Sequence, residues 1–118
     1  MIDILIVQGT TPSYEFELED ENNELVGADQ IKTVSVVFSQ RKSGIEIKKK
    51  YTKGASNNTC AFEKGIITVQ LTQEETLGFM EDQEVGVELK VLFNSGEVMV
   101  SDRYRARVVG VLDKEVLK

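Results

Sequence analysis

The chain has 118 residues, of which 41% are hydrophobic and 29% charged, and its net charge is −6 at pH 7. This length suits one domain with a real core, and the acidic balance argues against non-specific nucleic-acid binding, which needs a basic surface. The single cysteine excludes an internal disulfide, which fits a reducing cytoplasm or a particle assembled there. No apolar run approaches the roughly 20 residues of a membrane-spanning helix. We therefore expect one domain over residues 1–118, with no nucleic-acid and no membrane partner.

Short apolar runs separated by turn residues recur along the chain. Ile2–Val7 is rich in β-branched residues and ends at Gly9, and Tyr14–Glu19 alternates apolar and acidic residues as a half-buried strand does. Pro12 excludes a regular central strand between these two. Further strands are expected at Thr33–Ser39, Ile45–Lys48, Thr59–Phe62, Ile66–Leu71, Val85–Phe93, Val98–Val100 and Tyr104–Val109. Many short strands with little helix predict an all-β, antiparallel β-sandwich.

One short helix is expected after the strand that ends at Leu71. Thr72 is placed to cap it, Glu75 to reach back in a capping box, and Gly78 to end it. A phosphate site at such a strand-to-helix step needs glycines and a Lys-Ser/Thr pair. Here the first turn carries Glu74 and Glu75, whose carboxylates repel an anion. The pattern therefore predicts a corner between two sheets.

Catalytic and metal-binding patterns are weak in this sequence. The chain has no histidine, the commonest general base and metal ligand. Cys60 shares strand parity with Phe62, which predicts a buried, unpaired core thiol. Ser39–Lys42 matches the Ser-x-x-Lys pattern of serine–lysine hydrolases, but its companion motifs are missing. Asn57–Thr59 matches a glycosylation sequon, but nothing in the sequence suggests secretion. Glu19–Glu24 is acidic but lacks the Asp spacing of a calcium loop. We expect no enzyme activity, no catalytic, cofactor-binding or metal-binding residues, and no cofactor.

Charge is distributed in blocks. Tyr14–Asp29 carries only acidic charges, whereas Arg41–Lys53 is strongly basic, with Glu46 as its one acid. Two interpretations remain open. The blocks pair within the fold or are solvated, or they steer one copy of the protein onto another, because complementary patches set register and association rate.

The first segment, Met1–Val7, is apolar on both faces. Ile2, Ile4 and Ile6 are expected to point one way, and Leu5 and Val7 the other. A strand apolar on both faces is expected to be covered on both sides. Asp3 is the only charged residue in it that opposes pairing of its edge with another strand. A second copy or another protein would cover it, unless the strand crosses between the sheets or the tail Leu112–Leu117 caps it.

Three stretches resemble the small β-sandwich domains of phage tail and baseplate proteins. They are Tyr14–Asp20 followed by Leu25–Ala28, then Gly65–Thr76, and then Val87–Gly96. The stretches are also similar to the N-terminal domain of the phage baseplate upper protein, an immunoglobulin-like sandwich. The opening Gln-Gly-Thr-Thr-Pro, at Gln8–Pro12, is similar to short prophage proteins of Gram-positive bacteria.

The resemblance implies an immunoglobulin-like sandwich with one short helix. It also implies a non-enzymatic prophage structural or assembly protein (tail, baseplate or other virion component) that contacts other phage structural proteins and its own copies. Such a protein resides in the bacterial cytoplasm during assembly and then in the virion. Because the sequence stops at Lys118, where baseplate proteins continue into a carrier or receptor-binding segment, we expect a stand-alone component. The alternative is a glycan- or cell-surface-binding module, which usually stacks sugars on exposed aromatic rings; Trp is absent, and most Tyr and Phe are expected to point inward.

Overall fold

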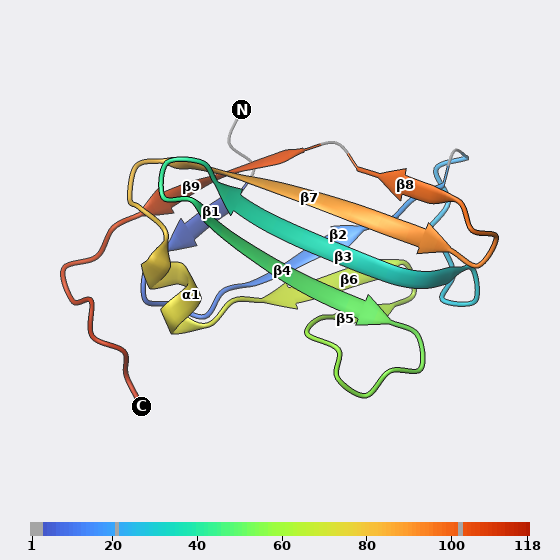
Figure 1. Cartoon of the computed structure of the whole chain (residues 1–118), viewed down its shortest axis with the longest axis horizontal. Coiled ribbons are helices and arrows are strands. Elements are labelled where there is room, and N and C mark those ends of the chain that lie inside the picture. Colours follow the sequence, from blue (N-terminus) through green and yellow to red (C-terminus); the bar gives the residue numbers. More distant parts are fainter. Residues whose placement is uncertain (1–3, 21, 102) are drawn as a thin grey trace.

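The computed structural model describes residues 4–20, 22–101 and 103–118 and shows two stacked sheets with a short helix at one end (Figure 1). The strands are β1 (Ile4–Val7), β2 (Ser13–Glu17), β3 (Ile31–Gln40), β4 (Ile45–Thr52), β5 (Ala61–Glu63), β6 (Ile66–Gln70), β7 (Glu84–Phe93), β8 (Val98–Val100) and β9 (Tyr104–Val109). The helix, α1, runs over Gln73–Gly78. The expected strands at Val98–Val100 and Tyr104–Val109 are confirmed without any change of bounds.

The strand order identifies the fold class. The large sheet has the order β1-β9-β7-β3-β4, with β8 also paired to β7, and the small sheet has the order β2-β6-β5. This division of strands, with β4 added beside the β3-β7-β9 group, is that of a variable-type immunoglobulin sandwich. The predicted all-β, immunoglobulin-like sandwich with one short helix is confirmed. One pair, β1 with β9, is parallel, since strands far apart in sequence need no tight hairpin between them.

The core lies between the sheets and follows from the two-residue period of the strands. Aromatic rings bridge the two layers, with centroid distances of 6.1 Å for Tyr14–Phe38, 5.1 Å for Phe16–Tyr104 and 5.9 Å for Tyr51–Phe62. The buried aliphatic side chains are Ile6, Leu18, Val26, Ile31, Val34, Val36, Ile67, Val69, Leu71, Val85, Val87, Leu89, Val91, Ala106 and Val108.

Strand β1 lies at the edge of the large sheet, and β9 is its only partner among the described strands. Ile6 is buried on its inner face, whereas Leu5 is 57% exposed on the outer face. The Tyr14 hydroxyl donates a hydrogen bond to the Leu5 carbonyl (2.7 Å), which joins β1 to the small sheet. The tail does not cap this strand, because Leu112 and Leu117 are exposed and the Leu117 backbone bonds instead to the side chain of Gln73. The expectations for Met1, Ile2 and Asp3 lie outside the described residues.

Helix α1 makes the predicted corner between the sheets. Thr72 Oγ1 accepts a hydrogen bond from the Glu75 backbone N–H (3.1 Å), and the Glu75 carboxylate accepts one from the Thr72 N–H (2.8 Å), so the capping box is confirmed. No helix in the described part of the chain has the length and apolar character needed to cross a membrane.

Buried glutamines, which the sequence analysis did not predict, fix the segment that follows α1. Gln40 is only 1% exposed; its amide donates to the Met80 carbonyl (2.9 Å) and accepts from the Met80 N–H (2.7 Å). The Gln8 amide donates to the Phe79 carbonyl (2.7 Å). These bonds satisfy backbone groups that no strand ladder reaches.

Candidate functional site: two oppositely charged outer faces

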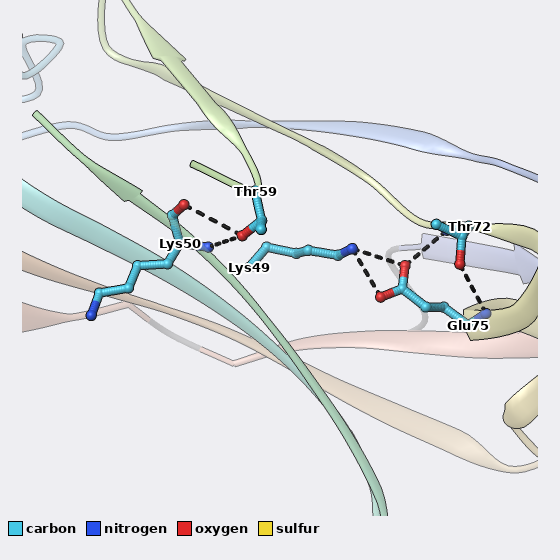
Figure 2. A network of polar contacts seen from close by, with 5 residues as sticks. All are labelled: Lys49, Lys50, Thr59, Thr72 and Glu75. Carbon is cyan, nitrogen blue, oxygen red and sulfur yellow. Dashed lines mark hydrogen bonds and ion pairs between the residues drawn. The ribbon is translucent and has the colours of Figure 1, made fainter. Parts of the chain in front are cut away.

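The three consecutive lysines of β4 divide between the two sides of the large sheet. Lys49 points inward, where its ammonium lies 2.9 Å from both carboxylate oxygens of Glu75. Lys50 leaves the strand in the opposite direction (Figure 2), and Lys48 shares its side because successive side chains alternate. Strand alternation therefore places two lysines of the run, Lys48 and Lys50, on the outer surface.

A hollow of about 280 Å³ lies on this outer surface, with Ser35 of β3 in its floor. Ser35 pairs with Lys50 of β4 on one side and with Lys90 of β7 on the other. Neighbouring strands lie about 4.8 Å apart, so the two lysines stand about 10 Å apart across the serine. Ser35 is only 7% exposed, and no hydrogen bond of its hydroxyl occurs within the described residues. The hollow is lined by Thr33, Ser35, Lys48, Lys50, Lys90, Leu92 and Val98.

Basic charge dominates this side of the large sheet, which we call the basic face. Two of its acids are already paired: Glu88 lies 3.8 Å from Arg103 and Glu84 lies 2.6 Å from Arg105. Among the described residues, no ion pair involves the three lysines of the hollow. The outward charged residues of this sheet are Glu46, Lys48, Lys50, Glu84, Glu88, Lys90, Arg103, Arg105 and Arg107.

Exposed apolar side chains adjoin the hollow. Val98 and Val100 of β8 are 51% and 50% exposed, and β8 pairs only with β7 in the described part of the chain. Val98 stands opposite Leu92, and Val100 stands opposite Lys90. The basic face thus combines apolar area with unpaired positive charge.

The outer side of the small sheet is acidic, and we call it the acidic face. Glu15 and Glu17 of β2 and Glu63 of β5 are exposed there, and the strands carry no outward basic residue. Ile66 of β6 pairs with Glu17 on one side and with Glu63 on the other. The carboxylates of Glu17 and Glu63 therefore flank a half-buried isoleucine, and the strands that carry them lie two strand spacings from each other.

A larger hollow of about 550 Å³ lies at the end of the sandwich near β8. It is lined by Asp20, Val26, Asp29, Gln30, Phe93, Asn94, Ser95, Glu97, Val98 and Met99. The Asp20 carboxylate accepts hydrogen bonds from the backbone N–H groups of Asn22 (2.8 Å) and Glu24 (3.1 Å). It therefore stabilises its own loop. The described residues contain no group of three or more His, Cys, Asp or Glu side chains arranged to hold a metal ion.

Cys60 lies just outside β5 and packs against the core, but it is half-buried, so the predicted buried thiol is only partly covered; it is a free cysteine. The strand expected from Thr59 begins only at Ala61. Thr59 lies beside β4 instead, where its hydroxyl accepts a hydrogen bond from the Lys50 N–H (2.8 Å; Figure 2). Burial raises the pKa of the Cys60 thiol to about 11, and the positive charge of Lys49, which lowers this pKa, only partly offsets the effect. The thiol is thus protonated at neutral pH.

The two other short motifs, Ser39–Lys42 and Asn57–Thr59, lie in a strand end with its turn and in a loop. Ser39 faces outward on β3 opposite Glu46, and Lys42 lies exposed in the following turn; no hydrogen bond between the two occurs within the described residues. The Asn58 side chain accepts from the Thr52 N–H (2.8 Å) and donates to the Thr52 carbonyl (3.1 Å), so it fixes the loop after β4.

The fold and its surface define a β-sandwich of immunoglobulin-like topology whose two outer faces carry opposite charge. No protein-family model and no curated protein sequence matches the chain. Among solved structures, the chain is similar to CopC from Methylosinus trichosporium OB3b, with 11% identity and a TM-score of 0.46, over 96% of this chain and 89% of that one. It is also similar to the V domain of amphioxus IgVJ-C2, with 14% identity and a TM-score of 0.37, over 90% and 99% of the two chains. Similarity at this level brings no function to the chain.

Proposed function

We propose that this chain is a non-enzymatic structural or assembly protein of a phage particle and that it acts through protein–protein contacts made by its basic face. The observation that carries the proposal is the set of Lys48, Lys50 and Lys90 around Ser35, without an ion pair among the described residues and beside exposed Val98. The phage assignment rests on the sequence resemblance. With it comes the expected location, the bacterial cytoplasm during assembly and then the virion.

The chemistry of the basic face suits a protein partner. Protein interfaces combine an apolar centre with a polar rim, and complementary charge fixes register and raises the association rate. Val98, Val100 and Leu92 supply the apolar part, and the lysines supply the charge. A standard interface buries about 800 Å² on each partner, roughly a tenth of the 7509 Å² surface of this chain. One face of a sandwich measuring 47 × 32 × 22 Å offers that area.

The alternative, a glycan- or cell-surface-binding module, finds less support. Sugar rings stack on exposed aromatic side chains, and this chain has three Tyr, five Phe and no Trp. None of these eight side chains, all within the described residues, is exposed; they are Tyr14, Phe16, Phe38, Tyr51, Phe62, Phe79, Phe93 and Tyr104. A sandwich with this surface is better suited to polar and apolar protein contacts than to ring stacking.

The experiment is to induce the prophage in its host, purify the particles on a density gradient, and quantify this chain against a capsid protein by mass spectrometry. We expect a constant ratio of this chain to the capsid protein across the gradient fractions. The chain should stay bound after a high-salt wash only if other contacts add to the charged ones. Absence of the chain from intact particles and from assembly intermediates would overturn the proposal. Binding of the purified chain to a glycan array, lost in an aromatic variant such as Phe93→Ala, would favour the alternative.

A further inference from the structure

We propose that the partner of the basic face is the acidic face of a second copy of this chain, so that copies stack head to tail. This inference rests on the proposed function only in taking the basic face to be a protein-binding surface. Both faces are present on every copy, and they lie on opposite sides of the sandwich.

The charged side chains on the two faces have matched spacing. On the basic face, Lys50 and Lys90 flank Ser35 in one row of the ladder. On the acidic face, Glu17 and Glu63 flank Ile66 in one row. Each pair is separated by two strand spacings, about 10 Å. A small sheet laid on a large sheet therefore brings each carboxylate over one lysine.

The shapes at the centre of these rows also match. Ser35 lies in the floor of the hollow with its side chain only 7% exposed. Ile66 stands in the middle of the acidic row and is half-buried within its own chain. When the two rows are superposed, the isoleucine side chain enters the hollow between the lysines and contacts Leu92. Its insertion removes apolar area from water at the centre of the contact, as interfaces generally do.

The four charged side chains of the two rows form no ion pair within the described residues. Among the described residues, the ion pairs are those of Lys49, Arg103 and Arg105, and none of them involves a side chain of the two rows. The two faces lie on opposite sides of the molecule, so one copy cannot bring them together. Contact between copies neutralises both sets of charge at once, which is the physical advantage of stacking.

Head-to-tail contact has a consequence for the assembly. Because the two surfaces in contact are different, each added copy leaves one basic and one acidic face open at the ends. Growth continues into an open stack unless rotation between copies closes a ring. A two-fold dimer, in contrast, would use the same patch on both copies and would stop at two.

The experiment uses two charge-reversal variants of the whole chain. Lys50→Glu/Lys90→Glu makes both faces acidic, and Glu17→Lys/Glu63→Lys makes both basic. Sedimentation velocity at low salt should show concentration-dependent species larger than a dimer for the wild type, and association weakened about tenfold or more for each variant alone. An equimolar mixture of the two variants should regain association, because each variant then meets an opposite face on the other.

Controls separate this contact from general charge effects. Arg41→Glu/Lys42→Glu reverses two positive charges in the exposed turn after β3 and should leave stacking intact; circular dichroism should show the wild-type fold for all variants. The neutral pair Lys50→Gln/Lys90→Gln, which carries little risk to folding, should remove the salt dependence. A wild type that stays monomeric at millimolar concentration, that stops at a dimer, or whose variants fail to restore each other overturns the inference. A monomeric chain that is still found in particles leaves the proposed function standing with another protein as the partner.

Discussion

Lys49 and Glu75 form an ion pair that joins the large sheet to the corner helix, with the ammonium nitrogen 2.9 Å from both carboxylate oxygens. The pair is largely shielded from solvent, at 13% and 25% side-chain exposure. It brings an inward-facing lysine close to the core, which an apolar interior does not tolerate without a partner. Because side chains alternate along a strand, the inward position of Lys49 leaves Lys48 and Lys50 on the outer, basic face.

We expect Glu75→Gln to lower the free energy of unfolding by about 1 kcal/mol at pH 7, while Glu74→Gln, its exposed neighbour, has little effect. Burial raises the pKa of Glu75, but hydrogen bonds from Lys49 and from the Thr72 backbone outweigh it and leave the pKa below its usual value. A lowered folded pKa stabilises the protein above the unfolded value, and this contribution is lost as the pH falls through the folded value. Urea unfolding between pH 3 and pH 7 tests this; a wild-type advantage that persists unchanged at the lowest pH contradicts it.

We expect Gln40→Leu to destabilise the protein by about 2–3 kcal/mol, because it removes the buried amide that bonds both the Met80 N–H and the Met80 carbonyl. Gln70→Leu is the matched control, since Gln70 is exposed and makes one long bond of 3.4 Å to Thr11. Chemical denaturation of both variants gives the comparison. Equal losses for the two would show that the buried amide is not the anchor of this segment.

The Cys60 thiol is expected to react slowly in the folded protein. Burial raises its pKa from 9.0 to about 11, which cuts the thiolate fraction at pH 8 about a hundredfold; the greater nucleophilicity of a more basic thiolate recovers about tenfold. The alkylation rate should therefore lie about tenfold below that of the urea-unfolded chain, and it should keep rising beyond pH 9. A folded-state rate equal to the unfolded one would mean that the thiol is freely solvated.

We expect no metal dependence of stability. The acidic Glu19–Glu24 loop, which lacks the Asp spacing of a calcium loop, uses the Asp20 carboxylate to hold its own backbone. Melting temperatures with calcium, with zinc and with EDTA should agree within a degree or two. A shift of several degrees with any one of these would reveal a metal site and refute this prediction.

Strand period accounts for the parts of the fold that the sequence predicts well. The alternation from Val85 to Phe93 gives β7, and the turn signals around it give β8 and β9. Strand β4 was predicted to end at Lys48, but it continues to Thr52, because Lys49 occupies an inward position that only a tertiary ion pair makes tolerable. Hydropathy cannot reveal such a partner 26 residues away.

The candidate site was less predictable than the fold. The sequence shows the blocks of charge, but it does not show which charged side chains lie in one row across neighbouring strands. The alignment of Lys50, Ser35 and Lys90 depends on the register of three strands, and register follows from turn geometry and core packing. The same is true of Glu17, Ile66 and Glu63.

The most direct test of the two-face account is cross-linking with a zero-length carbodiimide, which joins only carboxylates and amines in contact. A mixture of ¹⁴N- and ¹⁵N-labelled chains identifies links between copies by mass spectrometry. The account predicts mixed-isotope links from Lys50 or Lys90 to Glu17 or Glu63, and their loss at high salt. Links from these lysines to Asp29 or Glu97 of the larger hollow instead, or none between copies where sedimentation detects assembly, would contradict it.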